Sequence, residues 1–357
     1  MLSPVRSSLR IMRILVVGNP HPIHVGAHFF HAACSSDFAT SMCDTHLAFD
    51  APWPVVKFNW HLRKHRPPRL YAFGAHVIET CYCFKPDVLL CTGLAPLDSN
   101  ILKKIGRLGI QRVNFLTDDP WNPAHYAPWF FDALPAYDCV FSPRQANLDE
   151  LRHAGCHKVN YLPFAYNPDI HFVGSLEPDE PHKTFACEVM FAGGADHDRL
   201  PWITALIRHQ FHTALYGGYW ERYAETRRYT YGLADMETLR RAVAGAHVSL
   251  CLVRRANRDG HVMRSFEIPA MGGCMLTEDT PEHREIFGAE GEAVVYFRTI
   301  DEMIAKLRWL LDHPDERQRL ATAAHRLITG GQHTYRDRLM TMLEHVSTLS
   351  SQRRQPA

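Results

Sequence analysis

An arginine and two acids in one short segment are the strongest candidates for chemistry in this sequence. Asp259 and Glu267 lie eight positions apart, and Arg264 precedes Glu267 by about one helical turn. A helix predicted over 262–271 begins with unpaired backbone N–H groups, and such groups bind anions, including a diphosphate. The Arg264 guanidinium adds a fork of donors that suits phosphate oxygens. A carboxylate at Glu267 can accept hydrogen bonds from ribose hydroxyls, so the segment predicts a site for a nucleotide sugar.

The same two charges can also be explained without a ligand. Arg264 and Glu267 stand at i and i+3, where opposite charges pair on many helix surfaces, and an exposed pair of this kind adds little stability. The flanking residues favour a ligand site instead. Gly260 and His261 lie in the loop before the predicted helix, and the glycines at 272–273 end that helix before a strand.

A second pair of acids, Asp118 and Asp119, ends a strand predicted over 112–119. Ligands of parallel sheets bind at the carboxyl ends of the strands, so one of these carboxylates could act as a general base toward an acceptor hydroxyl. The alternative is that Asp119, which precedes Pro120, only caps a turn. If the reaction retains the configuration of the sugar, the leaving phosphate takes the proton and no protein base is needed.

Histidines gather around a helix predicted over 24–34, namely His21, His24, His28 and His31. The last three share one helical face, which is a spacing that metal ligands use. Because no acidic residue is interleaved and no matching second set of ligands follows, we predict no metal site. A polar helix that contacts the acceptor explains the pattern better, with His24 and His28 as contact residues.

Length and charge narrow the class of protein. A chain of 357 residues is long enough for two cores. Lys+Arg 39 against Asp+Glu 38 leaves a net charge of +1, which predicts no nucleic-acid partner. No apolar run approaches the roughly 20 residues of a membrane helix, so no transmembrane segment is predicted, although contact with a membrane surface stays open. The 10 cysteines are scattered and no secretory signal is evident, which predicts reduced thiols and a cytoplasmic protein.

The order of the predicted elements indicates two α/β domains. Short β-branched runs alternate with longer helical stretches over 13–165 and again over 187–330, which predicts a parallel sheet covered by helices in each domain. The stretch 166–186, rich in Pro, Asp and Glu, is predicted as a linker. Residues 1–12 are predicted as a disordered extension, and 331–357 as a C-terminal helix that can cross back to the N-terminal domain. The expected fold class is therefore α/β, with two Rossmann-like domains facing a central cleft.

The periodicity of apolar and polar residues also predicts the individual strands and helices. Strands are expected at 13–19, 85–93, 112–119, 138–142 and 159–164, and in the second domain at 187–194, 211–218, 246–253, 273–279 and 293–297. Helices are expected at 24–34, 71–84, 143–154, 236–246, 262–271, 299–313, 314–330 and 334–349. Thr299 and Glu302 have the spacing of a capping box. Four tryptophans are assigned to Pro-rich loops, as buried anchors or as stacking faces for a sugar: Trp53, Trp60, Trp121 and Trp129.

Several motifs together carry a resemblance to a known family. In the second domain they are FAGGADHDRL (191–200), ALYGGYW (214–220), RSFEIPAMGG (264–273), LTED (276–279), REIFGAEGEAVVYF (284–297) and GQHTYRDRL (331–339). In the first domain FLTDDPWNP (115–123) is similar to an Asp-Asp-Pro segment of relatives. With these motifs the chain resembles the CgeB/spore-maturation branch of group 1 glycosyltransferases, mainly over 187–340.

The resemblance implies a glycosyltransferase of the GT-B fold, in which the second domain binds most of a nucleotide-diphosphate sugar. It implies that Glu267 binds the ribose, that neither a metal nor another cofactor is required, and that configuration is commonly retained. Asp259 stands where relatives often have the first Glu of a Glu-x7-Glu pair. The shorter side chain at this position is a departure from the family pattern.

The contacts to the donor phosphates have several candidates. Relatives use an Arg and a Lys, and this sequence does not have that pair in the usual form. Four arginines compete for the role: Arg199, Arg254, Arg255 and Arg264. Gly193 and Gly194 follow a predicted strand, and their lack of a side chain would let the backbone approach the donor closely.

Other functions fit parts of the sequence. A nicotinamide-dependent oxidoreductase is disfavoured because the first strand leads into GNPHPIHVG (18–26), which lacks GxGxxG. A nucleotide-sugar 2-epimerase shares the two-domain fold. A non-catalytic subunit that binds a nucleotide sugar or a glycan would suit the substitution at Asp259. We predict a glycosyltransferase whose acceptor is a glycan, a protein or a small molecule.

Overall fold

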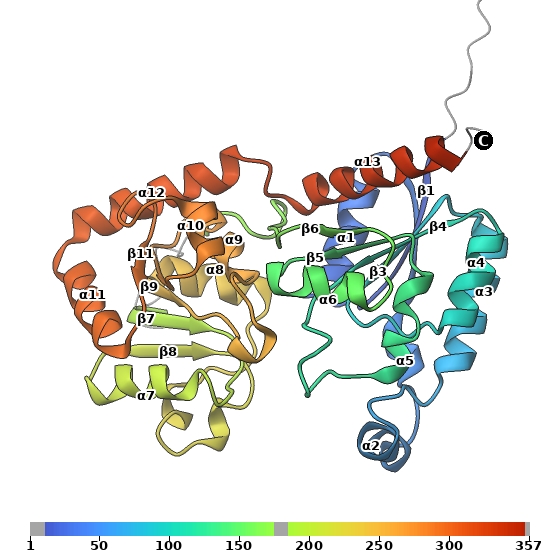
Figure 1. The fold of residues 1–357 in the computed structure, drawn as a ribbon. Helices are drawn as coiled ribbons and strands as arrows, with labels where there is room; N and C mark the ends of the chain where they lie inside the picture. The colour runs from blue at the N-terminus through green and yellow to red at the C-terminus, as the bar shows by residue number, and fades with distance from the viewer. Residues whose placement is uncertain (1–10, 175–184, 354–357) are drawn as a thin grey trace, which may run out of the picture. The chain divides into compact units, whose positions relative to one another are not determined.

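The computed structural model of the chain describes residues 11–174 and 185–353 (Figure 1). Much of the predicted extension over 1–12 and of the predicted linker over 166–186 therefore lies outside the described residues. Within the described residues, no helix is long and apolar enough to cross a membrane. The ten cysteines are all free thiols.

The chain forms two compact units, and each takes its residues from more than one stretch of sequence. The first unit contains the chain up to Ser142, then Asn147–Tyr161, then the chain from Leu339. The second unit contains Pro143–Ala146 and Leu162–Arg338. The short segment after Ser142 thus belongs with the second unit, although both stretches that flank it in sequence belong with the first.

The sheet of the first unit is parallel throughout, with the strand order β2-β1-β3-β4-β5-β6. Its strands are β1 (Arg13–Gly18), β2 (Ala39–Asp44), β3 (Val88–Thr92), β4 (Gln111–Phe115), β5 (Cys139–Ser142) and β6 (Val159–Tyr161). The order reverses between β1 and β3, which makes their carboxyl ends the topological switch point where ligands of such sheets bind. β1 is buried from its second residue on, as expected of a central strand covered on both faces.

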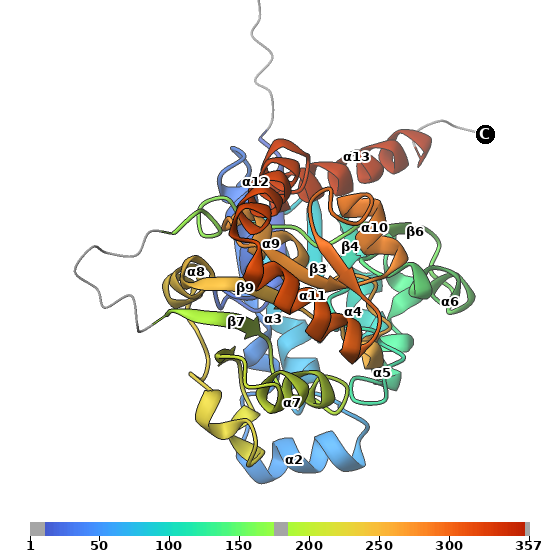
Figure 2. The same cartoon turned by 90° about the vertical axis from the view of Figure 1, so that its left-hand side faces the viewer.

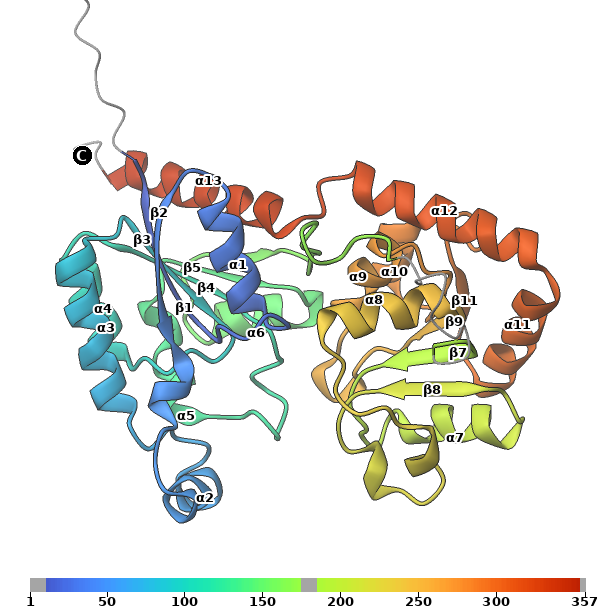
Figure 3. The ribbon, with the colours of Figure 1, turned by 180° about the vertical axis from the view of Figure 1, so that it is seen from behind.

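Helices of the first unit lie on both faces of this sheet, and one of them, over 53–62, is largely exposed. They are α1 (Val25–Cys34), α2 (Trp53–Leu62), α3 (Leu70–Phe84), α4 (Ser99–Arg107), α5 (Pro128–Phe131), α6 (Leu148–His153) and the part of α13 (Tyr335–Arg353) from Leu339 on. α1 lies on one face and α3 with α4 on the other (Figure 3). α3 buries Phe73, Val77 and Cys81 at helical spacing. α4 begins where the Asp98 carboxylate accepts the Ile101 N–H at 2.9 Å.

The sheet of the second unit is also parallel, with the strand order β11-β10-β9-β7-β8. Its strands are β7 (Cys187–Ala192), β8 (Thr213–Tyr216), β9 (Ala246–Cys251), β10 (Met275–Glu278) and β11 (Val295–Phe297). Its switch point lies between β7 and β9. Along β7, Val189 and Phe191 enter one hydrophobic core while Met190 and Ala192 enter another, so the strand is buried on both faces.

The helices of the second unit complete those two cores. They are α7 (Leu200–Arg208), α8 (Met236–Gly245), α9 (Arg264–Ala270), α10 (Pro281–Phe287), α11 (Ile300–Asp312) and α12 (Pro314–Gly330) (Figure 2). α7, α11 and α12 pack in the core of Val189, and α8 packs in the core of Met190. Short 3-10 helices occur at Thr45–Ala48, Leu134–Ala136, Gln145–Asn147, Trp220–Arg222, Arg227–Tyr229 and Arg255–Asn257.

The end of α9 shows how the sequence sets an element boundary. The Gly272 N–H donates to the Pro269 carbonyl at 2.9 Å, and the Gly273 N–H donates to the Ile268 carbonyl at 3.1 Å. This pair of bonds is a Schellman motif, and Gly272 takes the left-handed conformation that the motif requires, with φ +79°. The glycine pair therefore ends the helix where it was predicted to end.

The predicted fold class, two Rossmann-like α/β domains with a C-terminal helix, is confirmed. Each predicted strand overlaps an observed one, but β2, α2, α4, α5, α7 and α10 were not predicted. β2 was not predicted because only Cys43 among its residues is buried, so the strand shows no clean alternation of apolar and polar residues. α2 was obscured by Pro52 and Pro54, which a helix tolerates in its first turn. The assignment of Trp53 and Trp60 to loops was therefore wrong, since both lie on α2 and are exposed. The assignment of Trp129 to a loop was wrong as well, since it lies on the short helix α5.

The capping box predicted before α11 is formed in part. Thr299 Oγ1 accepts the Glu302 N–H at 3.2 Å, as the motif requires. The Glu302 carboxylate, however, accepts the N–H of Arg298 at 2.8 Å, one residue before the cap. The helix start is still satisfied from both sides, because each side chain takes up one unpaired backbone donor.

Candidate functional site

The turns after β7 and β8 pack against each other through glycines. The Gly193 N–H donates to the Tyr216 carbonyl, and the Trp220 indole N–H donates to the Gly193 carbonyl, both at 2.8 Å. Gly217 has φ +153°, and a Cβ there would stand 2.2 Å from the Gly193 carbonyl oxygen. A Cβ added to Gly194 would find its nearest neighbour at 3.5 Å. Of the two glycines predicted to approach a donor, Gly193 packs against the Phe191 and Arg199 side chains, and Gly194 has the more open surroundings.

Arg199 spans the switch point of the second sheet. Its guanidinium donates to the carbonyl of Gly194 after β7 at 3.2 Å and to that of Leu252 after β9 at 3.5 Å. It also lies over the Phe191 ring, 5.5 Å from the centroid. Burial, and then the nearby charge of Arg254, lower the pKa of Arg199. Arg199 therefore holds the ends of β7 and β9 together.

The next two arginines at this edge have different partners. Arg255 donates to the Glu278 carboxylate at 2.9 Å and lies over the Trp202 ring, 5.4 Å from the centroid. The Arg254 Nε is 3.8 Å from an Asp196 oxygen, and its side chain is 36% exposed. Arg254 lies 3.8 Å from its acid, against 2.9 Å for Arg255, and is the stronger phosphate candidate of the two.

A buried histidine that was not predicted holds the first turn of α9. The Val262 N–H donates to Ser265 Oγ at 3.1 Å, and Ser265 Oγ lies 2.8 Å from His283 Nε2. His283 Nδ1 lies 2.8 Å from the Glu278 carbonyl oxygen, which can only accept. Burial lowers the pKa of His283 to about 4. The ring is therefore neutral near pH 7, carries its proton on Nδ1 and accepts a hydrogen bond from Ser265.

Arg264 and Glu267 form an ion pair in the first turn of α9. The Glu267 side chain is 1% exposed and that of Arg264 27%, and the other Glu267 oxygen lies 3.6 Å from His171 Nε2. Burial lowers the pKa of Arg264 to about 10, which leaves the guanidinium charged near pH 7. The loop from the carboxyl end of β9 leads directly into this turn. The pair thus differs from exposed helix pairs, because a buried charge is costly unless it is compensated.

Asp259 forms a second buried ion pair, with Arg144. Arg144 Nε donates to Asp259 Oδ1 at 2.5 Å, and the two side chains are 1% and 5% exposed. Arg144 belongs to the segment Pro143–Ala146, which groups with the second unit. Asp259 therefore holds this segment on the loop before α9. The expected contact of Asp259 with a donor stays a prediction. Arg144 was not predicted from the sequence as a site residue.

Gly260 and His261 are both buried in the loop before α9. The Gly260 carbonyl accepts the Thr280 hydroxyl at 2.5 Å. The His261 ring is 0% exposed, and its Nε2 accepts the Phe164 N–H at 3.1 Å. Burial, and then the neighbouring His283, lower the pKa of His261 well below its usual value, so the ring is neutral. These contacts place His261 as a support for the chain around Phe164.

The HTYRDRL motif supports the same stretch of chain. Arg338 is 7% exposed and donates to the carbonyls of Pro163 at 3.0 Å and Phe164 at 3.2 Å. The His333 ring lies 5.5 Å from the Phe266 ring of α9, and burial lowers its pKa. The motif therefore contacts both α9 and the chain at Pro163 and Phe164.

The two acids after β4 in the first unit have different environments. Asp119 is 1% exposed, and its Oδ1 accepts the Trp121 N–H and the Asn147 amide, both at 2.9 Å. This is the turn-capping arrangement that the sequence offered as the alternative to catalysis. The Asp118 side chain is 33% exposed, and its Oδ1 lies 3.6 Å from His125 Nε2. Asp118 is therefore the better placed of the two to meet an acceptor.

The histidines of α1 also differ from one another. His24 precedes the helix, and its ring lies 5.9 Å from that of His21. Partial burial lowers the pKa of His24, the neighbouring His21 and His46 lower it further, and Asp118 opposes them. His28 is 1% exposed on the helix. Both residues proposed as acceptor contacts stay predictions, and His24 lies within electrostatic reach of Asp118.

Comparison with known proteins adds to this geometry. Residues 199–344 match the family model described as "Glycosyl transferase-like", which is less than half of the chain. A search of curated proteins finds no match. The matched region contains Arg199, Arg254, Asp259, Arg264 and Glu267, all described above.

Solved structures resemble the chain over nearly its whole length. Sucrose-phosphate synthase from Thermosynechococcus elongatus superposes with a TM-score of 0.66 at 11% identity, covering 95% of this chain and 99% of that one. Anabaena Alr3699/HepE, in complex with UDP and glucose, gives 0.65 at 12% identity, covering 94% and 100%. A putative UDP-N-acetylglucosamine 2-epimerase from Listeria monocytogenes gives 0.54 at 12% identity, covering 92% and 95%. These likenesses show that the chain has the GT-B fold.

Proposed function

We propose that this protein is a glycosyltransferase that moves a sugar from a nucleotide-diphosphate donor to an acceptor. The observation that carries the proposal is the pairing of Arg264 with the buried Glu267 in the first turn of α9. It lies where the loop from the carboxyl end of β9 enters the helix, and inside the region that matches the glycosyl transferase-like model. UDP is bound in a solved structure of the same fold, which supports a nucleotide donor.

In this proposal the donor lies along the carboxyl edge of the second sheet. The Glu267 carboxylate accepts hydrogen bonds from the ribose hydroxyls, and Arg264 and Arg254 face the diphosphate. The backbone at Gly194 approaches the donor. Without a donor, Arg264 and His171 compensate the buried charge of Glu267, and the arriving phosphates would draw Arg264 away from it. The other predicted donor residues support these contacts: Gly193, Arg199, Asp259, Gly260 and His261.

The chemical step joins the acceptor oxygen to the anomeric carbon and breaks the bond from that carbon to the diphosphate. We propose retention of configuration without a metal, in which case the leaving phosphate takes the acceptor proton. In an inverting reaction Asp118 would take that proton, because its side chain is 33% exposed whereas Asp119 is buried. His24 would contact the acceptor, a carbohydrate or a protein. Membership of the CgeB/spore-maturation branch and a cytoplasmic location are part of the same proposal.

A thermal-shift panel of nucleoside diphosphates and nucleotide sugars tests the donor site. A ligand that binds only the folded state at 100 times its Kd stabilises that state by about 2.7 kcal/mol. We expect at least one nucleotide to raise the melting temperature of the protein, and Glu267→Gln to remove most of that rise. The matched control is Glu237→Gln on α8, whose exposed carboxylate lies 3.6 Å from Arg241 in an ordinary helix pair.

Two results would contradict the donor site. One is a panel in which no nucleotide at saturating concentration stabilises the protein. The other is a nucleotide that stabilises Glu267→Gln as much as the protein itself, which would move the ribose away from α9. Loss of the rise in Glu237→Gln as well would mean that the effect is not specific to Glu267.

The likeness to a putative 2-epimerase supports nucleotide-sugar epimerisation as an alternative function. The engagement of Asp259 by Arg144 is compatible with a third reading, a subunit that binds a nucleotide sugar without acting on it. Incubating the stabilising nucleotide sugar with the protein, with and without acceptor mixtures, separates the three by NMR of the products. Released nucleoside diphosphate supports transfer, a new epimer supports epimerisation, and an unchanged sugar supports binding alone.

A further inference from the structure

α2 presents an apolar surface that the candidate site does not use. Of its ten residues only Asn59 is buried. Its large apolar side chains are exposed by 41% to 72%, namely Trp53, Val55, Phe58, Trp60 and Leu62. A helix that is apolar around most of its circumference is normally covered. Apolar surface gathered in this way marks a place where a protein meets a partner or a membrane.

Most of the charged residues around α2 are cationic. The stretch 51–78 contains five cationic residues and no Asp or Glu: Lys57, Arg63, Lys64, Arg66 and Arg69. Asp50, just before the stretch, pairs with Arg69 at 2.9 Å. A second copy of this surface would be repelled by like charges, whereas an anionic surface would be attracted. A complementary partner therefore has an apolar interior for the side chains of α2 and a negatively charged surface for the cations.

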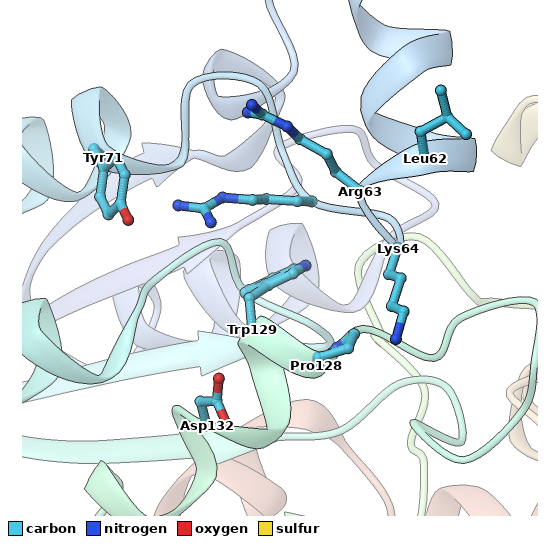
Figure 4. Close-up of a pocket in the computed structure, with 8 residues that line it drawn as sticks. Leu62, Arg63, Lys64, Tyr71, Pro128, Trp129 and Asp132 are labelled. Atoms are coloured by element: carbon cyan, nitrogen blue, oxygen red, sulfur yellow. The ribbon is translucent and has the colours of Figure 1, made fainter.

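A pocket of ≈ 690 Å³ opens beside the C-terminal end of α2 (Figure 4). Its lining combines three cations and two aromatic rings with one acid, namely Arg63, Lys64, Arg66, Tyr71, Trp129 and Asp132. The Arg66 guanidinium lies over the Tyr71 ring, 4.8 Å from its centroid. A pocket of this kind suits a phosphate with an attached organic group, because cations hold the charge and rings cover the rest.

The basic turn between α2 and α3 is held in place rather than loose. His65 Nδ1 lies 2.7 Å from the Tyr126 carbonyl oxygen, and the Trp129 indole N–H donates to the His65 carbonyl at 3.2 Å. Both partners of His65 belong to the first unit. The cations of the turn are therefore presented by a fixed backbone, which favours binding because less order must be imposed.

We propose that α2 and the turn over 62–66 dock this protein on an anionic lipid bilayer. The apolar side chains of α2 enter the boundary between headgroups and acyl chains, and the cations meet lipid phosphates. Lys57 already lies over the Trp53 ring at 4.8 Å and Arg63 over the Phe58 ring at 5.9 Å. The aliphatic parts of these side chains pack along apolar surface while their charged groups reach water, as those of Lys and Arg do at a membrane surface. The proposal does not depend on glycosyl transfer.

Co-sedimentation of the full chain with lipid vesicles tests the docking surface. We expect the protein to bind vesicles of phosphatidylcholine with phosphatidylglycerol, and to bind vesicles of phosphatidylcholine alone at least tenfold more weakly. Binding to the anionic vesicles should weaken as the salt concentration rises. The triple variant Trp53→Ala, Phe58→Ala, Leu62→Ala should lower the binding at least tenfold. The triple variant Lys57→Ala, Arg63→Ala, Lys64→Ala should do the same.

Two control variants match these in number and kind. Leu108→Ala, Leu233→Ala, Leu327→Ala removes exposed apolar side chains elsewhere, and Lys103→Ala, Lys104→Ala, Arg107→Ala removes exposed cations of α4. Both should bind vesicles like the unmodified protein, and circular dichroism should show all four variants folded.

Equal sedimentation with both vesicle types would overturn the proposal, as would unchanged binding by the folded apolar triple. Binding to poly-glutamate without binding to anionic vesicles would overturn it in favour of an acidic protein partner. Because none of these measurements uses a nucleotide, the docking proposal and the proposed function can fail separately.

Discussion

Asp259 and Arg144 compensate each other's charge in a place that water hardly reaches, with side chains 5% and 1% exposed. Removing one partner of a buried ion pair leaves an uncompensated charge and costs about 3–5 kcal/mol. We therefore expect Asp259→Leu to lower the free energy of unfolding by about 3 kcal/mol. The double variant Asp259→Leu, Arg144→Met should regain part of that loss, since apolar pairs often replace buried ion pairs without penalty. Urea unfolding followed by circular dichroism measures both values.

A loss below about 1 kcal/mol in the single variant would mean that the pair is solvated. The same experiment bears on the site, because the sequence spacing places two acids beside one nucleotide sugar. In the structure each acid has its own cation, Arg144 for Asp259 and Arg264 for Glu267. Spacing indicated Arg264, which lies three residues from Glu267. It could not indicate Arg144, which lies 115 positions from Asp259.

Among the elements, the paired turns after β7 and β8 offer the sharpest test. A Cβ at Gly217 would stand 2.2 Å from the Gly193 carbonyl oxygen, while a Cβ at Gly218 would meet nothing within 4 Å. Overpacking of this kind costs about 1–3 kcal/mol. We expect Gly217→Ala to lower the melting temperature by several degrees and Gly218→Ala to leave it within about one degree. Differential scanning calorimetry of the two variants makes the comparison.

Equal melting temperatures for the two alanine variants would contradict the close packing of the turns. The outcome also concerns function, because Gly193 and Gly194 form one of these turns. A shifted turn in Gly217→Ala would move the backbone at Gly194. Nucleotide stabilisation should therefore weaken in Gly217→Ala and persist in Gly218→Ala.

Elements with strong local signals were predicted well, and those with weak ones were not. The glycine pair after α9 and Thr299 before α11 mark helix ends through hydrogen bonds between near neighbours, and both were predicted. β2 was missed because an edge strand with one buried residue shows little alternation. α2 was missed because its prolines suggested a loop, although in the first turn they are compatible with a helix.

For the molecule as a whole, the buried histidines make stability depend on pH. Burial lowers the pKa of His261, of His283 and of the half-buried His333. An unfolded His283 takes up a proton near pH 6.5 and the folded one only near pH 4. Between these values the unfolded chain binds more protons, so the free energy of unfolding falls as the pH falls. His283 alone accounts for about 3 kcal/mol of that loss.

Urea unfolding between pH 7.5 and pH 4 measures this dependence. We expect the free energy of unfolding to drop steadily over that range, and the difference between the protein and its His283→Gln variant to shrink by about 3 kcal/mol. A constant difference across the range would show that His283 does not titrate as its burial requires. Because Ser265 and Val262 depend on His283, the variant should also loosen the first turn of α9.

The fold class could be predicted from local sequence, because the residues that specify a strand or a helix are close together along the chain. The same is true of the α9 segment, where Arg264 and Glu267 pair within one helical turn. The supports of that segment come from distant parts of the chain, from Arg144 through His171 and His283 to Arg338. Although Arg338 lies in a motif that the sequence showed, no local pattern indicates that these residues contact the α9 segment, since each became its neighbour only when the chain folded. Which predicted residues are buried supports and which are open to a ligand was therefore decided by tertiary packing.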